Sequence, residues 1–183
     1  MSTVYVFLAD GFEDIEGLAV VDLLRRAKVE TRTVSIKDTK EVQTSHGITL
    51  YTDLLFCETD FSDAAILVLP GGLKGTQNLQ AYEPLTTMLQ EFYGAEKKIA
   101  AICAAPSIFG ALGFLKGRNA TSYPSFMEKL DGAILSTERV VKDGHVITSR
   151  GMGTAIDFGL ALIAELCGQE KADEIAAQIV YNH

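Results

Sequence analysis

The sequence predicts an α/β protein in which a mostly parallel sheet lies between two layers of helices, a three-layer α/β/α sandwich. Strand-like and helix-like runs alternate along the chain, and the runs Ala65 to Leu69 and Ile99 to Ile102 are apolar throughout. Such runs are typical of parallel strands that helices cover on both faces. Because the chain has 183 residues, of which 48% are hydrophobic, we expect one domain over residues 1–183.

The first half of the chain has a βαβα order. A strand over Val4 to Leu8 precedes a helix over Ile15 to Ala27 and a strand over Val29 to Ile36. The segment Lys37 to Tyr51 is predicted to be an inserted hairpin. The strand Ala65 to Leu69 follows it and leads to a helix over Pro84 to Tyr93.

The second half continues with a strand over Lys98 to Ile102 and a helix over Ala105 to Leu112. A hairpin is predicted from Val140, Val141, Asp143-Gly144, Val146 and Ile147, because a short Asp-Gly turn separates two β-rich runs. Two helices close the chain, over Thr154 to Cys167, with Gly168 as the predicted C-cap, and over Glu170 to Ile179.

Composition excludes several classes of function. A net charge of −8 and a pI near 4.9 disfavour binding to nucleic acid. Apolar segments stay well short of membrane-spanning length, and the first residues lack a basic leader, so we expect a soluble, unprocessed protein. The cysteines Cys57, Cys103 and Cys167 lie far apart without metal-ligand spacing, which predicts no disulfide, no metal and a reducing, cytoplasmic setting.

Cys103 is the candidate nucleophile. It ends an apolar strand just before a helix starts, and helix N-terminal amides and the helix dipole favour negative charge there. This position predicts a stabilised thiolate. The alternative is a buried cysteine that fills a gap under the sheet, since free cysteine is among the most buried residue types.

Ligands of open α/β sheets bind beyond the carboxyl ends of the strands, where we expect the loops after Leu8, Leu69 and Ile102 to meet. The first loop is rich in carboxylates, which argues against a phosphate-bearing cofactor such as FMN or a dinucleotide. We therefore expect no cofactor. The acidic residues Asp10, Glu13 and Asp14 are explained as offsetting the dipole of the helix that follows.

Glu16 has a different position, one helical turn after Phe12, so that its carboxyl can turn back toward Cys103. Beside a thiolate it is expected to hold its proton. The Gly71-Gly72 pair on its own permits only a tight turn. Beside a thiolate, however, the Gly72 and Ala104 amides form two donors for a developing oxyanion.

These residues lie in motifs that cover nearly the whole chain: Ala9 to Glu16 (ADGFEDIE), Val21 to Ala27 (VDLLRRA), Val68 to Gly72 (VLPGG), Ala100 to Pro106 (AAICAAP) and Thr148 to Phe158 (TSRGMGTAIDF). In this order the chain resembles the ThiJ/PfpI superfamily, and within it the subgroup of the Parkinson-disease protein DJ-one and its bacterial relatives. The resemblance implies a flavodoxin-like, class I glutamine amidotransferase-like fold.

The resemblance also implies roles for individual residues. Cys103 takes the nucleophile-elbow position, Glu16 is its protonated partner, and Gly72 and Ala104 are the backbone donors. It further implies a homodimer that packs around the helix Ile15 to Ala27, with Arg26 reaching toward the pocket.

Two departures from the family pattern matter. Tyr123 stands where the best-known member has a histidine, and a phenol does not relay protons at neutral pH as imidazole does. Ala104, rather than histidine, follows the nucleophile, so the Cys-His triad of the protease branch is absent and we expect no peptidase. We place Gly71, Tyr123 and His46 in the pocket.

The remaining histidines and cysteines match no motif. His145 and His183 are predicted to lie at the surface, Cys167 in the core, and Cys57 either in the core or at the periphery.

The resemblance implies a stress-protective, cysteine-dependent enzyme that acts without cofactor on small α-oxoaldehydes such as methylglyoxal or on their early protein adducts, as a glutathione-independent glyoxalase or deglycase. The alternative is a redox sensor or chaperone-like protein in which Cys103 is oxidised to a sulfinate. The superfamily name also suggests thiamine-related metabolism, but the sequence offers no site for a thiazole or phosphate.

Overall fold

The computed structural model describes residues 3–181 and has a seven-stranded sheet in the order β10-β11-β7-β6-β1-β2-β5. Neighbouring strands are parallel except for the antiparallel pair β10 and β11. The strands of this sheet are β1 (Thr3–Leu8), β2 (Thr31–Ser35), β5 (Leu54–Leu55), β6 (Ala64–Leu69), β7 (Lys98–Ile102), β10 (Val140–Asp143) and β11 (Val146–Ser149). The predicted mostly parallel sheet is therefore confirmed.

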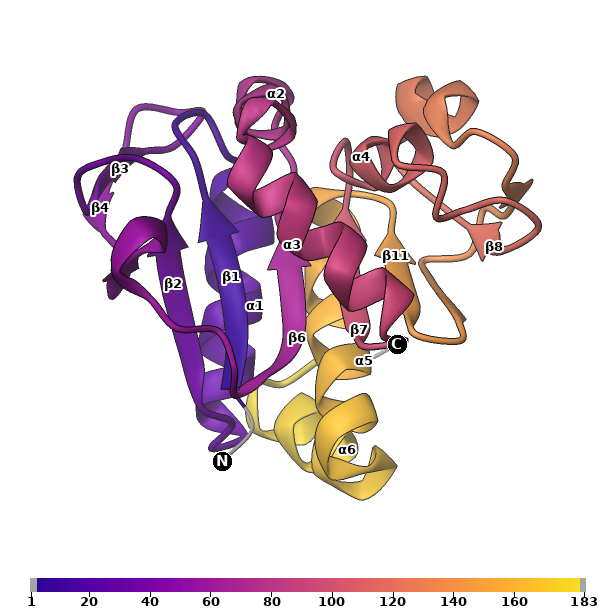
Figure 1. The fold of residues 1–183 in the computed structure, drawn as a ribbon. Helices are drawn as coiled ribbons and strands as arrows, with labels where there is room; N and C mark the ends of the chain where they lie inside the picture. The colour runs from indigo at the N-terminus through magenta and orange to yellow at the C-terminus, as the bar shows by residue number, and fades with distance from the viewer. Residues whose placement is uncertain (1–2, 182–183) are drawn as a thin grey trace.

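Helices cover both faces of the sheet, as Figure 1 shows with α3 in front and α1 and α5 behind. Alternation along β1 explains the two cores, since Val4, Val6 and Leu8 face one layer while Tyr5 and Phe7 face the other. One layer contains α1 (Asp14–Arg26), α5 (Ala155–Cys167) and α6 (Gln169–Gln178). The other contains α2 (Leu73–Ala81), α3 (Glu83–Gly94) and α4 (Pro106–Ala111).

Short elements complete the fold. The predicted insertion is a hairpin of β3 (Glu41–Gln43) and β4 (Thr49–Tyr51), which pair antiparallel. A second small sheet pairs β8 (Asn119–Ala120) with β9 (Ile134–Leu135). Three short 3-10 helices are η1 (Phe56–Glu58), η2 (Pro124–Lys129) and η3 (Met152–Thr154).

The strands and helices predicted from periodicity are all present, with ends within two residues of the expected ones. Gly168 follows α5 with a φ of 90°, so it has the backbone conformation that a glycine C-cap supplies. Helix α2 was not predicted. Its sequence LKGTQNLQA contains an internal glycine and buries only Gly75, Thr76 and Leu79, so the apolar periodicity that announces a helix is weak.

Two cysteine predictions are settled by burial. Cys167 is exposed, and the prediction that it lies in the core is wrong. It belongs to the last turn of α5, after the buried pair Leu162 and Ile163, where the helix has passed the edge of the core. Cys57 is exposed in η1, so of the two alternatives it is the peripheral thiol.

Across residues 3–181, every helix is too short or too polar to cross a membrane.

Candidate active site

The candidate site lies at the carboxyl ends of β1, β6 and β7, where the loops after these three strands meet. Strand order reverses between β1 and β6, which is where open α/β sheets bind their ligands. The amide N–H of Gly71, after β6, donates to Oε2 of Glu16 at 3.0 Å, and Cys103 follows β7 directly. The predicted meeting of the three loops is confirmed.

Cys103 occupies a strained corner. Its φ of 66° lies in the left-handed region, which residues with a side chain seldom adopt. The backbone around it holds this conformation, because the Cys103 N–H donates to Ser149 O at 3.0 Å and the Tyr123 N–H donates to Cys103 O at 2.9 Å. Strain of this kind persists where surrounding contacts over-determine the backbone, as they do at nucleophile elbows.

Glu16 is almost completely buried, with 1% of its surface exposed, in the first turn of α1. Glu13 caps this helix, since its side chain accepts the Glu16 N–H at 2.8 Å. The Glu16 carboxyl is hydrogen-bonded to the Cys103 side chain and accepts from the amides of Gly71 and Met152. The sequence analysis does not predict the Met152 amide as a donor. A signal was present, because the Met152 motif follows β11, which pairs parallel to β7 and therefore ends at the same edge of the sheet.

The two glycines after β6 leave space that no side chain can share. A methyl group at Gly71 would lie 2.5 Å from Glu16 Oε2 and 2.6 Å from Cys103 Cβ. Gly72 has a φ of 87° and caps α2, so both its conformation and its close backbone neighbours require glycine. The amides of Gly72 and Ala104 both donate toward the Cys103 sulfur.

Burial raises the pKa of Glu16 to about 7, and the charge of Glu13 adds to the effect. Hydrogen bonds from Cys103, Gly71 and Met152 oppose it without cancelling it. The Glu16 carboxyl therefore gains and loses its proton near neutral pH, where a general acid or base works best.

Burial, followed by the charge and hydrogen bond of Glu16, raises the pKa of the Cys103 thiol to about 12, while the Gly72 and Ala104 amides lower it. This direction is opposite to the predicted one, because the prediction from the strand-to-helix corner did not weigh burial of the sulfur against its amide donors. The two groups titrate as a pair, and the proton that Glu16 holds removes the negative charge that disfavours a thiolate.

The other acids of the first loop have separate partners. Asp10 accepts the Gln43 N–H at 2.9 Å and pairs with Lys37 Nζ at 2.8 Å. It therefore ties the β3–β4 hairpin to the sheet, and the predicted role of offsetting a helix dipole does not describe it. Asp14 accepts from Ser45 Oγ at 3.2 Å and pairs with His46 Nδ1 at 2.7 Å, again toward the hairpin.

The structure corrects the pocket prediction for His46, whereas the prediction for Arg26, which depends on a dimer, stays a prediction. His46 pairs with Asp14 rather than with the Cys103 group, and 71% of its side chain is exposed. Arg26 pairs with Asp22 at 2.7 Å in the last turn of α1. Ten residues of helix, about 15 Å at 1.5 Å per residue, separate it from Glu16, so it does not reach the pocket of its own chain.

Tyr123 borders the site. A methyl group at Gly151 would lie 3.3 Å from the Tyr123 ring and 3.8 Å from Glu16 Oε1, so the ring and the carboxyl flank the same glycine. His145 is half-buried against Tyr93, with ring centroids 4.9 Å apart, because the β10–β11 turn folds onto α3, so it lies at the surface only in part. His183 lies outside the described residues.

Within residues 3–181, Glu13, Asp14 and His46 are the side chains that lie close enough together to hold a metal ion, with ligand atoms within 4.8 Å. Glu13 already caps α1, and Asp14 already pairs with His46. The group also lies at the N-terminus of α1, where the helix dipole opposes a cation. The arrangement is explained without a metal.

Known proteins resemble the chain along its length. The model of the DJ-1/PfpI family matches residues 2–165. Protein DJ-1 homolog A of Arabidopsis thaliana is 38% identical over 178 residues, which are 96% of this chain. The chain spans only 45% of that curated relative, less than half its length.

Two further proteins match over nearly their whole length. Glutathione-independent glyoxalase DJ-1 of Schizosaccharomyces pombe is 27% identical over 184 residues, 96% of each protein. The solved structure of oxidized Toxoplasma gondii DJ-1 has a TM-score of 0.95 at 34% identity and covers both chains completely. The family model, the relatives and the shared flavodoxin-like fold agree with the motifs, and the chain belongs to the DJ-1/PfpI family.

Proposed function

We propose that the protein is a cysteine-dependent, glutathione-independent glyoxalase that converts small α-oxoaldehydes such as methylglyoxal to hydroxyacids. The observation that carries this proposal is the buried Glu16 carboxyl, whose pKa is raised to about 7, hydrogen-bonded to Cys103 at its strained corner. The glyoxalase relative from Schizosaccharomyces pombe supports the same chemistry at 27% identity.

The first step is addition of the thiolate to the aldehyde. With the proton on Glu16, the Cys103 sulfur attacks the aldehyde carbon, a C–S bond forms, and the carbonyl electron pair moves to oxygen. The Gly72 and Ala104 amides, which donate toward the sulfur, stabilise the oxyanion, and Glu16 gives it a proton. The product of this step is a hemithioacetal.

The second step moves hydrogen between adjacent carbons. The Glu16 carboxylate removes the proton from the carbon bonded to sulfur and returns it to the neighbouring carbon. The hydroxyl proton of the hemithioacetal passes to the neighbouring oxygen, which leaves a thioester beside a new hydroxyl. Water then breaks the C–S bond and restores the thiol. Methylglyoxal and one water give lactate, so the reaction needs no oxidant, reductant or cofactor.

The proposal extends to early adducts of these aldehydes with protein side chains. Such adducts keep a carbonyl carbon beside the newly bonded one. The Cys103 sulfur replaces the side chain on the newly bonded carbon, and the freed side chain leaves with the thiol proton, so that the same hemithioacetal forms. Isomerisation and hydrolysis by one water then release the hydroxyacid, which is the deglycase form of the reaction.

Lactate formation from methylglyoxal tests the proposal, with no glutathione added. We expect Cys103→Ala to abolish it, while Cys57→Ser and Cys167→Ser, which change the exposed thiols, retain it. Circular dichroism checks that the fold survives. Equal turnover by Cys103→Ala would show that the thiol is not the nucleophile.

A second candidate function is redox sensing. The solved Toxoplasma gondii relative is described as oxidized, and a protonated Glu16 donates a hydrogen bond to a Cys103 sulfinate as readily as to a thiolate. Two equivalents of peroxide supply the two oxygens and leave as water. After mild peroxide, mass spectrometry should find two added oxygens on Cys103 before Cys57 or Cys167 changes; even oxidation of all three contradicts this role.

We also propose a homodimer that packs around α1. Two apolar side chains one turn apart on this helix are exposed, Ile15 by 49% and Leu18 by 40%, and Ile48 of the hairpin is exposed by 53%. Leu18→Glu should halve the mass that light scattering gives for the wild type; a monomeric wild type contradicts the proposal.

The three free cysteines support the predicted reducing, cytoplasmic setting.

A further inference from the structure

We propose that a groove on the α3 face of the molecule binds a basic amphipathic peptide segment. The groove has a volume of about 680 Å³ and lies between α3 and the chain that leads from η1 to β6. It shares none of its lining residues with the Glu16–Cys103 site, so the inference does not rest on the proposed glyoxalase activity.

The floor and one wall of the groove are apolar. Pro84, Met88 and Phe92 follow one another at intervals of four residues on α3, and Met88 and Phe92 are 8% and 7% exposed. The opposite wall is Phe56 and Phe61, whose ring centroids lie 5.0 Å apart. Both rings also contact the buried Phe7, so the wall belongs to the aromatic core of this layer.

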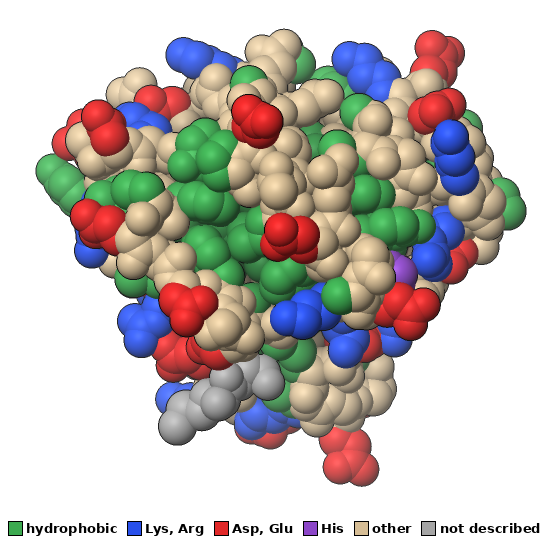
Figure 2. Space-filling view, viewed as in Figure 1, with side chains coloured by type: hydrophobic (Ala, Val, Ile, Leu, Met, Phe, Trp, Pro, Cys, Tyr) green, Lys and Arg blue, Asp and Glu red, His purple; other side chains and the backbone are tan. Residues whose placement is uncertain are grey.

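The rims of the groove are acidic. Glu83 and Glu91 lie two turns apart on α3, beside the apolar row, and Asp60 lies on the other side. Figure 2 shows hydrophobic side chains gathered in the middle of this face, with separate acidic side chains around them. Three carboxylates against one lysine favour a ligand that carries positive charge beside its apolar groups.

Among the described residues, Lys97 is the cation that lines the groove, and it shows where a ligand cation fits. Lys97 Nζ lies 4.7 Å from the centroid of the Phe92 ring, the geometry of a cation–π contact. A lysine or arginine of a peptide competes for this position. Removal of Lys97 should therefore strengthen binding, whereas removal of a rim carboxylate should weaken it.

Charge also decides between occupants. A second copy of this chain would bring its own acidic rim against this one, and the net charge of −8 adds to the repulsion. An uncharged apolar segment would leave the carboxylates without partners. A basic segment with apolar side chains matches both the floor and the rims.

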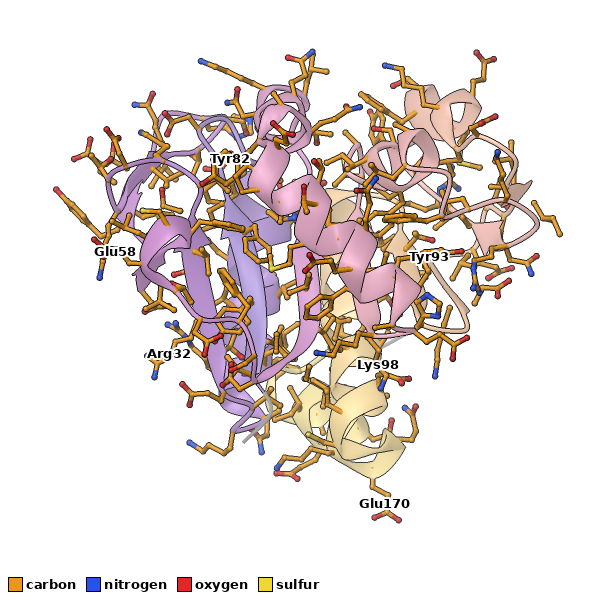
Figure 3. The ribbon with its side chains drawn as sticks, viewed as in Figure 1. Arg32, Glu58, Tyr82, Tyr93, Lys98 and Glu170 are labelled. Atoms are coloured by element: carbon orange, nitrogen blue, oxygen red, sulfur yellow. The ribbon has the colours of Figure 1, made fainter. Side chains whose placement is uncertain are left out.

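Fluorescence anisotropy of a short labelled peptide of leucine and lysine, added to the full chain, tests the inference. We expect Glu83→Gln and Glu91→Gln each to weaken binding by about threefold, and Lys97→Ala to strengthen it by about threefold. Glu170→Gln removes the same charge from α6 and should leave binding unchanged. Figure 3 labels Glu170 at the lower end of the molecule, and Tyr82 and Tyr93 near the two ends of α3 on the front.

Three results would overturn the inference. The first is equal binding of a peptide in which glutamate replaces each lysine. The second is a loss of affinity in Glu170→Gln as large as that in the rim variants, which would mean general charge attraction. The third is no change in any groove variant. Cys103→Ala should bind the peptide as the wild type does. The peptide-binding result can therefore be interpreted even if the glyoxalase proposal fails.

Discussion

Two carboxyl groups in the first turn of α1 have pKa values that are shifted in opposite directions. Asp14 and Glu16 are two residues apart and both are buried, with 7% and 1% of their surfaces exposed. The pKa of Asp14 is nevertheless lowered, whereas that of Glu16 is raised to about 7. Position in the first turn of the helix and low solvent exposure therefore do not by themselves decide which carboxyl keeps its charge.

The neighbours of each group explain the difference. Burial acts to raise the pKa of Asp14, but hydrogen bonds from Thr44, His46 and Ser45 stabilise its charge and outweigh burial. Burial acts on Glu16 in the same direction, and its donors do not compensate, since one of them is the Cys103 thiol. Asp14 is thus an anchor for the β3–β4 hairpin, while Glu16 is suited to carry a proton.

The largest expected effect is on turnover. If the proposed glyoxalase reaction holds, Glu16→Gln removes its proton-transfer group, and lactate formation from methylglyoxal should fall by about a thousandfold. Asp14→Asn is the matched control, because it neutralises a buried carboxyl in the same turn and should retain most of the activity. Equal losses in the two variants would mean that helix α1, rather than the Glu16 proton, supports the reaction.

Stability should change with pH because of Glu16. Its folded pKa of about 7 lies above the ordinary value of 4.5, so the folded state binds more protons and stability falls as pH rises from about 4.5 to 7. The full loss is about 3 kcal/mol, at about 1.4 kcal/mol per pKa unit. Urea denaturation at several pH values measures it, and Glu16→Gln should remove the slope.

Asp14 sharpens this second test. Its pKa is lowered, so the stability that its charge contributes is present above about 3.8 and is lost as pH falls through the folded pKa. Asp14→Asn should therefore keep the wild-type slope between pH 4.5 and 7. If the slope disappears in Asp14→Asn instead, then Asp14 and not Glu16 causes the change of stability with pH.

A methyl group at Gly71 should disturb Glu16 and leave Asp14 alone. Gly71→Ala places a Cβ 2.5 Å from Glu16 Oε2 and 2.6 Å from Cys103 Cβ, and we expect about 2 kcal/mol of lost stability. Gly94→Ala is the control, since a methyl there meets nothing within 4 Å. Denaturation midpoints compare the two, and equal midpoints would contradict the close packing around Gly71.

The thiol reports on the same carboxyl. Because the charge of Glu16 helps to raise the pKa of Cys103, Glu16→Gln should lower it and speed alkylation of Cys103 by iodoacetamide about tenfold at pH 7. Peptide mass spectrometry reads the rate at each cysteine, with Cys57 and Cys167 as internal references. Slower alkylation in the variant would mean that Glu16 stabilises the thiolate at this pH.

The smallest effect concerns His46, which is exposed and whose pKa is raised by its hydrogen bond to Asp14 and by the charge of Asp14. A raised histidine pKa gives stability that is present below about 6.5 and is lost as pH rises through the folded value. His46→Gln should therefore be slightly less stable than the wild type at pH 5.5 and equal to it at pH 9. An equal difference at both values would contradict a charged pair.

Much of the fold was predictable from local sequence. The fully apolar runs of β6 and β7 indicated strands buried on both faces, and the parallel order followed from the alternation with helices. That order brings the ends of β1, β6 and β7 together, which is why Glu16, Gly71 and Cys103 could be placed in one site. Helix α2 was not predicted, because few of its residues are apolar and its sequence shows little apolar periodicity.

Residue periodicity and chain order were enough to predict the layers, the strand-end corner of Cys103 and the turn that carries Glu16. The direction of the Cys103 pKa shift and the pairing of His46 with Asp14 depend on how the chain folds, and the sequence pattern did not predict them. Burial and hydrogen bonding depend on residues far away in the chain, such as the Met152 amide that reaches Glu16. No local pattern states which donors surround a buried carboxyl or how strongly burial acts on it, and these two properties separate Asp14 from Glu16.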